Sequence, residues 1–182
     1  KILWDGYVVY DDGTACPEPP DPCGNPSRNG VNSLLYVGDD DNSPSAGFTH
    51  YRSDLDWNIS SIPDSARLIT ANFTVYFNSV DAKNDVMSFY HMEGSNTYYP
   101  NNDDGNTAFY NDLSNGTLYL TQQVVFVADP QIAVFDVASS AAFRTEFETR
   151  LQNGTDEFSI GVRSNETGTS NALPSTFFSA DY

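Results

Sequence analysis

The sequence has few basic residues and no long apolar run. It carries 8 Lys and Arg against 25 Asp and Glu, which gives a formal net charge of -17 over 182 residues. A charge of this size and sign repels nucleic-acid phosphates and anionic lipid surfaces at long range, so we expect no nucleic-acid partner. No stretch of about 18 apolar residues and no signal-peptide pattern occurs, so we also expect no membrane insertion.

The sequence also lacks the short motifs of common enzymes. It has no Gly-X-Ser-X-Gly, no His-Glu-X-X-His and no phosphate-binding glycine loop, and its two histidines, His50 and His91, lie far apart. The sequence does not exclude a glycoside hydrolase or a lyase, because the chain is rich in aspartate. The fold alone sets the distance between the two carboxylates that a glycoside hydrolase needs. We predict a protein that is not an enzyme.

Cysteine is scarce as well. The two cysteines, Cys16 and Cys23, bracket the proline-rich residues 17–22. A metal site would need more ligands, and no histidine or further cysteine lies close in sequence. We predict a disulfide that closes a short, stiff surface loop, with free thiols as the alternative.

Asparagine, by contrast, is abundant, and it forms five Asn-X-Ser/Thr sequons. They begin at Asn58, Asn72, Asn115, Asn153 and Asn165, each with a middle residue other than proline. Chance gives several sequons in such a chain. The placement of Asn72 on the polar face of a strand, and of Asn115 and Asn153 before glycine, favours real glycosylation sites. We therefore predict a secreted glycoprotein that is extracellular or at the cell surface.

The stretch Tyr51–Phe77 consists of two strand-like runs joined by a proline-containing turn. In the second run apolar and polar residues alternate, which is typical of a half-buried strand. Its expected buried side chains are Ile69, Ala71, Phe73, Val75 and Phe77. In the first run, Leu55 and Trp57 share a face. The connection is too short for a crossover helix, so we expect antiparallel neighbours.

Similar short runs recur along the chain. They are Ile2–Tyr10, Ser33–Gly38, Val86–Met92, Gly116–Ala128, Gln131–Val137, Phe158–Val162 and Thr176–Ser179. One segment differs, because Phe143, Phe147 and Leu151 recur at the helical spacing i, i+4 and i+8. About nine strands and one short helix, roughly Ala141–Leu151, predict an all-β antiparallel sandwich that forms a single domain over residues 1–182.

Two acidic runs suit a calcium ion. Asp39, Asp40 and Asp41 form the first, and Asp103 and Asp104 form the second. Calcium takes six to eight oxygen ligands and neutralises carboxylates that otherwise repel one another. The first run does not match an EF-hand loop, and solvated turns are the alternative to structural calcium sites.

Aromatic residues gather in the stretch Glu93–Gly116, which we expect to be a loop because turn residues occur throughout it. Tyr98, Tyr99 and Tyr110 are candidates for stacking on sugar rings. Aromatic rings on such a stretch also cover sheet edges or close a core. We favour packing.

Four segments of the chain together are similar to a known family. They are Asn25–Gly38, Tyr51–Phe77, Val134–Val162 and Phe177–Ser179. They resemble the extracellular β-sandwich modules called DNRLRE or disaggregatase-related domains. The best piece is Tyr51-Arg52-Ser53, followed by the turn Ser60-Ser61-Ile62-Pro63 and the strand Ala71–Tyr76.

The resemblance implies a jelly-roll-like fold and a role in surface or matrix proteins, in adhesins, or beside polysaccharide-degrading enzymes. Some relatives bind polysaccharides such as alginate. This chain departs from the family in two ways. It has Tyr98–Tyr110 where the family has a tryptophan-rich segment, and it stops at Asp181-Tyr182, where the family has a further strand.

The second departure leads to a hypothesis about assembly. A sandwich without its closing strand is a template for a strand from another chain, and head-to-tail contacts of that kind propagate into filaments. The expected donor residues are Ile2, Leu3, Trp4, Tyr7, Val8 and Val9. The alternative is truncation, in which the last strand belongs to a longer protein.

The sequence therefore favours a non-catalytic extracellular structural or adhesive protein, and we expect a glycosylated subunit of a surface filament or matrix joined by strand complementation. Its partners would be identical subunits or neighbouring domains. The alternative is a carbohydrate-binding module that binds a polysaccharide, with Trp4, Trp57 and Tyr119 as further aromatic candidates. Trp57 shares a face with Leu55, which favours a place in the core.

Overall fold

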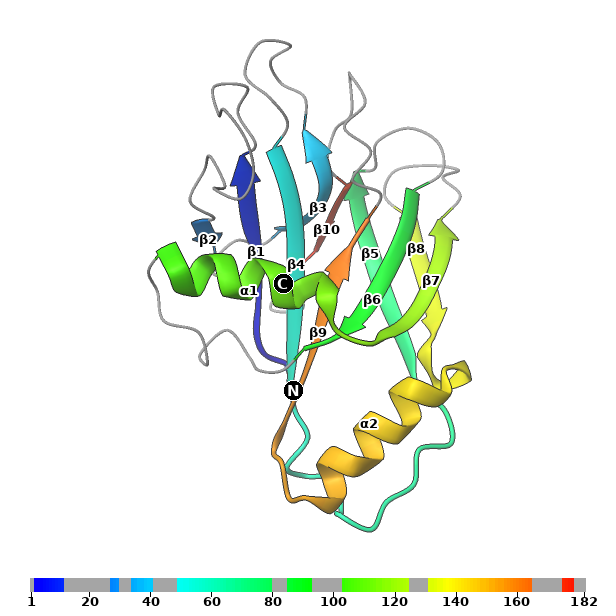
Figure 1. Ribbon diagram of the computed structural model, residues 1–182. Coiled ribbons are helices and arrows are strands. Elements are labelled where there is room, and N and C mark those ends of the chain that lie inside the picture. Colours follow the sequence, from blue (N-terminus) through cyan, green and yellow to red (C-terminus); the bar gives the residue numbers. More distant parts are fainter. Residues whose placement is uncertain are drawn as a thin grey trace.

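The computed structural model describes residues 2–11, 27–29, 34–40, 49–79, 85–92, 103–124, 131–164 and 175–178. These residues form two antiparallel sheets and two short α-helices (Figure 1). The predicted all-β class, a sandwich with a short helix, is confirmed. The jelly-roll connectivity stays a prediction.

The first sheet is built around β4 (Thr49–Asn58). Its strands run in the order β7 (Leu118–Val124), β6 (Asp85–His91), β9 (Glu157–Arg163) and β4. On its other side β4 pairs with β1 (Ile2–Asp11) and with the end of β3 (Leu34–Asp40), and β1 also pairs with β2 (Ser27–Asn29). The second sheet has the order β3, β10 (Ser175–Phe178), β5 (Asn72–Ser79) and β8 (Gln131–Asp136).

Strand β3 belongs to both sheets and changes partner at Gly38. Its residues Leu34 to Val37 pair with β10, whereas Gly38 to Asp40 pair with β4. Gly38 has a φ of 105°, a conformation that side chains with a Cβ rarely adopt. The glycine therefore lets one strand turn the corner between the two sheets.

The core lies between the sheets and follows the expected alternation. In β5, Val75 and Phe77 are buried while Thr74 and Tyr76 are exposed. Ile69 was expected on the same buried face, and this prediction is wrong, because the side chain is 86% exposed. The strand begins only at Asn72, so Ile69 lies in the preceding loop and not in the pleat that places its alternate neighbours inside.

Trp57 packs against the core, as its position beside Leu55 predicts. Its ring stacks on Phe73, with centroids 5.1 Å apart and planes 6° from parallel. Leu55 is buried, and Trp57 itself is partly buried. The ring therefore contributes to the sandwich interior and is not a flat platform on the surface.

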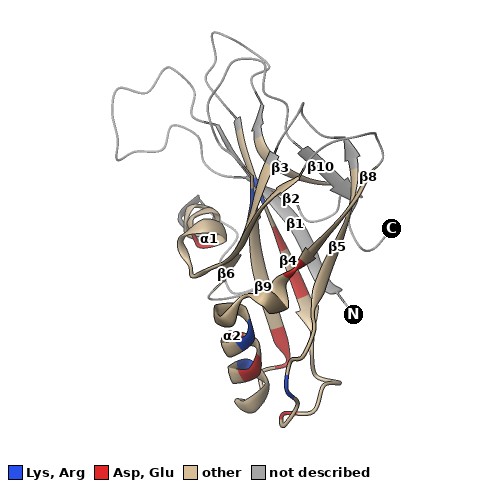
Figure 2. Ribbon diagram, turned by 90° about the vertical axis from the view of Figure 1, so that its right-hand side faces the viewer, with Lys and Arg blue, Asp and Glu red and all other residues tan. Residues whose placement is uncertain are grey.

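The expected helix is present as α2 (Ala141–Gln152) and lies at one end of the sandwich (Figures 1 and 2). The hydroxyl of Ser140 caps it by accepting a hydrogen bond from the backbone N–H of Phe143 at 3.3 Å. Phe143 and Leu151 are buried. Asn153 is the C-cap of the helix. The next residue, Gly154, has a φ of 67°, a conformation that suits a glycine after a helix.

A second helix, α1 (Asp103–Asn115), corrects the expectation of a loop between Glu93 and Gly116. It lies across the outer face of the first sheet (Figures 1 and 2). Phe109, Tyr110 and Leu113 bury themselves there together with Met92. The segment has few apolar residues, so its helicity depends on this packing more than on its own propensity.

Strands β1 and β10 bear on the hypothesis of a missing strand. Within the described chain, β1 pairs with β4 along most of its length, and β10 has a hydrogen-bonded strand on each side, β3 and β5. The expected donor segment thus has a place in its own sheet. Exchange of this strand between copies, and the extent of the domain, stay predictions.

Candidate functional site

A polar pocket of about 570 Å³ lies between α2 and the adjacent ends of β6 and β7. Its walls include His91, Thr117, Tyr119, Thr145 and Glu146, and the first-turn alanines of α2 complete the lining. This volume falls in the range of sites that take small ligands. We call this site the α2 pocket.

The strand side of the α2 pocket is fixed by a close backbone contact. His91 is the last residue of β6, and its N–H donates to the carbonyl of Thr117 at 2.8 Å. The chain passes from α1 to β7 through Gly116, and a Cβ at that position would overlap the carbonyl of His91. Glycine therefore allows the approach that places His91 beside Tyr119.

The helix side of the α2 pocket follows from the two faces of α2. Phe143, Phe147 and Leu151 pack toward the core, while Thr145 and Glu146 line the pocket. Thr149 donates a hydrogen bond to the carbonyl of Thr145 at 2.7 Å. A single helix thus closes the core with one side and supplies polar groups with the other.

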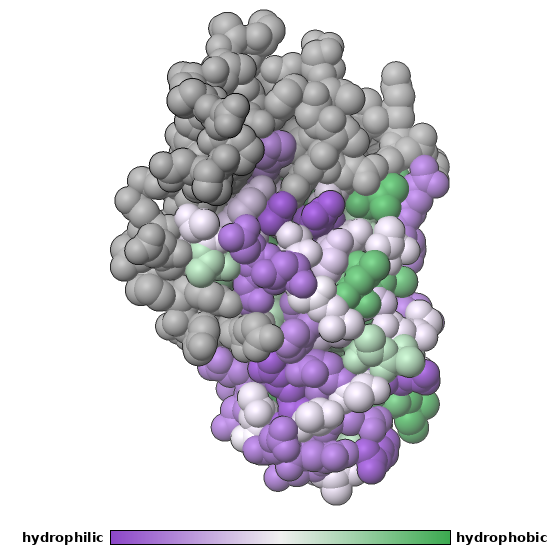
Figure 3. Space-filling model, in the orientation of Figure 1, coloured by the Kyte–Doolittle hydropathy of each residue, from purple (hydrophilic) through white to green (hydrophobic). Residues whose placement is uncertain are grey.

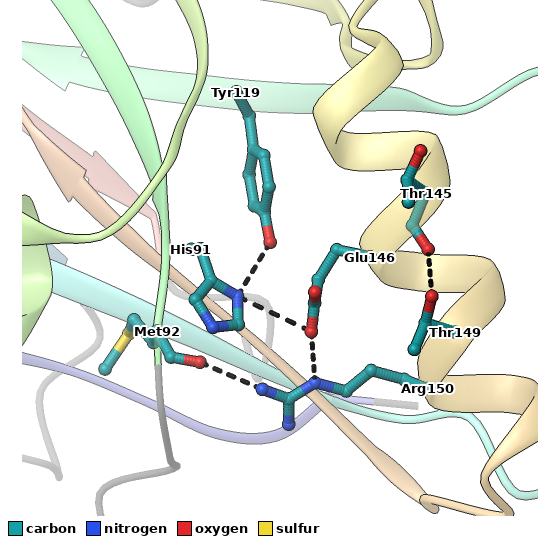
Figure 4. A network of polar contacts seen from close by, with 7 residues as sticks. All are labelled: His91, Met92, Tyr119, Thr145, Glu146, Thr149 and Arg150. Carbon is teal, nitrogen blue, oxygen red and sulfur yellow. Dashed lines mark hydrogen bonds and ion pairs between the residues drawn. The ribbon is translucent and has the colours of Figure 1, made fainter.

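A network of polar contacts joins the two sides (Figure 4). Nδ1 of His91 lies 3.0 Å from the hydroxyl of Tyr119 and 3.7 Å from Oε1 of Glu146. Arg150 donates from Nε to the same carboxylate oxygen at 2.9 Å and from Nη2 to the carbonyl of Met92 at 3.1 Å. The imidazole and the carboxylate are therefore held in place by both β strands and the helix.

The hydroxyl of Tyr119 stays protonated in this setting. The residue is 5% exposed, and its ring meets Phe143 edge to face at 5.3 Å. Burial, and after it the negative charge of Glu146, raise the pKa of Tyr119 well above its ordinary value, and Arg150 opposes them. The phenol can therefore donate to His91 whenever Nδ1 of the imidazole is unprotonated.

Tyr119 does not offer a stacking surface. Phe143 and Phe158 lie against its ring, with centroids 5.3 and 6.4 Å away. The contact that joins Tyr119 to the pocket network is made by its hydroxyl. Tyr119 was one aromatic candidate of the alternative, a carbohydrate-binding module, and in the structure its hydroxyl is the group that reaches the pocket network.

Tyr110 also packs instead of presenting its ring. It is 7% exposed, and the guanidinium of Arg52 lies 3.9 Å from its ring centre. Arg52 also donates to the carbonyl of Tyr110 at 3.0 Å. Tyr110 was a candidate for stacking on sugar, with packing favoured, and its burial and its contacts with Arg52 agree with packing. Tyr98 and Tyr99 lie outside the described residues.

The sequon asparagines lie on different elements. Asn72 in β5, Asn115 at the end of α1 and Asn153 after α2 are exposed. Asn58 is half-buried, and its side-chain oxygen accepts hydrogen bonds from Ser60, at 2.9 Å from the backbone N–H and 2.6 Å from the hydroxyl. Asn165 lies outside the described residues.

The predicted disulfide and the predicted calcium sites fall largely outside the described residues. Of these positions, Cys16, Cys23 and Asp41 are not described. The structure gives only the backbone of the other four, with Asp39 and Asp40 in β3 and Asp103 and Asp104 at the start of α1. In the ranges that are described, no three His, Cys, Asp or Glu side chains are grouped to hold a metal ion.

No protein-family model matches the chain, and no curated protein matches it. The resemblance to DNRLRE modules therefore stays a prediction. In the described part of the chain, neither helix has the length and apolar character needed to cross a membrane.

Sequence reasoning missed the α2 pocket, although two local signals were present. Glu146 and Arg150 are spaced i, i+4 on a helix, which favours an ion pair. His91 is the penultimate residue of the strand-like run Val86–Met92. The contact between His91 and Glu146 joins two segments that are distant in sequence, and only the fold brings these segments together.

Proposed function

We propose that this chain is a non-catalytic extracellular module with a structural or adhesive role in a surface or matrix protein. The observation that carries this proposal is the placement of the sequons. Asn72, Asn115 and Asn153 are exposed on three different elements, and none contributes to the core. Attached glycans would project into solvent without disturbing the sandwich.

The α2 pocket can be compared with the needs of one reaction, glycoside hydrolysis. Glycoside hydrolysis by the common mechanisms needs a pair of carboxylates beside the scissile bond. Among the described residues that line the pocket, Glu146 is the one carboxylate, and Arg150 already binds it.

The glycan prediction can be tested by expressing the chain in a secretory eukaryotic host. Glycopeptide mass spectrometry should find N-glycans at Asn72 and Asn153, and Asn→Gln variants at both positions should lose that mass. A fully secreted protein without glycan at any sequon would contradict the proposal.

The proposed assembly joins copies by exchange of β1. The strand pairs with β4 from Ile2 to Asp11, and the same pairs would form when a neighbouring copy supplies the strand. Negative-stain microscopy of the native protein should reveal filaments. A monodisperse monomer by light scattering, at high concentration and with added calcium, would refute this part of the proposal.

A second candidate function is carbohydrate binding, and the α2 pocket favours it. The pocket has the size of a small-ligand site and is lined by hydroxyl, imidazole and carboxylate groups that can hydrogen-bond to sugar hydroxyls. Affinity electrophoresis against acidic and neutral polysaccharides tests it. Retardation by one polymer would support this candidate, and unchanged mobility in all of them would count against it.

A further inference from the structure

We propose that the α2 pocket binds a neutral, hydroxyl-rich ligand, namely a sugar unit without a carboxylate or sulfate, and discriminates against acidic sugars. This inference rests on the carbohydrate-binding candidate and adds the charge class of the ligand and the residues that select it. Glu146 is the main selecting residue, and His91 and Tyr119 position the wall beside it.

The charges around the pocket argue against an anionic ligand. Glu146 places a carboxylate in the wall, and the cation nearest to it is Arg150. Arg150 is occupied by two acceptors of its own chain, Glu146 and the carbonyl of Met92, and its side chain is 19% exposed. Among the described residues that line the pocket, only His91 can add a positive charge. The net charge of -17 adds repulsion at long range.

The hydrogen-bonding groups suit neutral hydroxyls. A carboxylate accepts hydrogen bonds from sugar hydroxyls, and such charge-assisted bonds are stronger than neutral ones. Thr117 and Thr145 add hydroxyls that can both donate and accept, as sugar hydroxyls also do. The first-turn alanines of α2 add small apolar surfaces that can meet the C–H faces of a sugar ring.

The ring of His91 faces groups from two elements. The groups that face its ring are the phenol of Tyr119 on β7 and, on α2, Glu146 and beyond it Arg150. A neutral imidazole with Nδ1 unprotonated accepts a hydrogen bond from the phenol of Tyr119.

Titration of the whole chain with cellobiose, mannobiose and digalacturonate, followed by two-dimensional NMR at pH 7.5, tests the proposal. We expect the resonances of His91 and of the first turn of α2 to shift with a neutral disaccharide and not with digalacturonate. Glu146→Gln should weaken neutral binding about tenfold, because it removes a charged acceptor. Glu148→Gln makes the same change on α2 at a residue that binds the loop before β5, and it should leave sugar binding unchanged.

Each outcome decides between the two proposals. Tighter binding of digalacturonate than of both neutral sugars at pH 7.5 would overturn the charge selectivity and leave the carbohydrate-binding candidate standing. Binding that shifts resonances away from the pocket, or that Glu146→Gln leaves intact while the spectrum stays folded, would overturn the assignment to this site. No shift with any of the sugars would refute the carbohydrate-binding candidate and this inference together.

Discussion

Gly161 in β9 lies at a close approach of α1 to the first sheet. A Cβ at this position would overlap the backbone carbonyl of Leu113, so the helix or the strand would have to move. Both are held by packing, because Leu113 and the neighbouring Ile160 are fully buried. Helix α1 can therefore pack this closely on β9 only because residue 161 is a glycine without a Cβ.

We predict that Gly161→Ala lowers the free energy of unfolding by about 1–3 kcal/mol, the range found for overpacked sites. Urea denaturation at 25 °C measures it. Thr74→Ala, at an exposed position of β5, serves as control and should cost less than about 1 kcal/mol. Equal stability of Gly161→Ala and the unmodified chain would mean that α1 does not lie this close.

Tyr119 should make the stability of the fold sensitive to alkaline pH. Burial raises its pKa in the folded chain above the unfolded value of about 10. The protonated phenol of Tyr119 then contributes fully to the free energy of unfolding below pH ~10. This contribution is lost as the pH rises toward the folded pKa, because the unfolded chain releases the proton first. We predict that stability falls less steeply between pH 9.5 and pH 11.5, a range set by that value, in Tyr119→Phe than in the unmodified chain.

Urea midpoints measured across that interval check this prediction. Tyr76→Phe is the matched control, since it removes the same hydroxyl from an exposed tyrosine of β5. Parallel curves for Tyr119→Phe and the unmodified chain would show that the phenol is not held in its protonated form.

Helix α2 holds the loop before β5 through the side chain of Glu148. Its carboxylate accepts from the backbone N–H of Leu68 at 3.0 Å and from Arg67 at 2.7 Å. These contacts, the backbone hydrogen bond first, lower the pKa of Glu148 below its ordinary value. Because the folded pKa is lowered, the ionised carboxylate of Glu148 stabilises the fold fully above the unfolded pKa of about 4.3. This stabilisation is lost as the pH falls through the folded pKa.

We predict that the amide of Leu68 exchanges with solvent faster in Glu148→Gln, and that in the unmodified chain its protection declines as the pH falls through the lowered pKa of Glu148. Hydrogen exchange by NMR measures both. Arg67→Gln should have a smaller effect, because it leaves the backbone hydrogen bond in place. Unchanged protection of Leu68 in Glu148→Gln would show that the helix does not hold this loop.

The elements that sequence patterns predicted are those whose signal is local. The alternation of β5 and the i, i+4 spacing of Phe143 and Phe147 in α2 depend on neighbours along the chain, so periodicity alone revealed them. Helix α1 was missed because Phe109 and Leu113 are buried only against the sheet and Met92. The α2 pocket was missed for the same reason, since its groups come from distant segments.

Among the described residues on the face seen in Figure 3, the apolar ones gather along the right-hand side, and hydrophilic residues cover most of the rest. The exposed large apolar side chains of the described residues are Ile69, Tyr76, Leu118, Ile132 and Val134. Charges of both signs occur on α2 (Figure 2). The net charge of the chain is nevertheless strongly negative. Any assembly of copies must therefore bring negatively charged molecules together.

Assembly should therefore depend on ionic strength. Each copy carries a formal charge of -17, and the Debye length falls from about 30 Å at 0.01 M salt to about 8 Å at 0.15 M. We predict that light scattering at pH 7 finds monomers at the lower ionic strength and larger particles at the higher one, since screening removes repulsion between neighbours while β1 exchange supplies the contact. Sodium and calcium chloride matched in ionic strength separate screening from a specific calcium effect. Particles that form equally well at both salt concentrations would show that charge does not control the contact, and monomers throughout would leave the strand-exchange proposal without support.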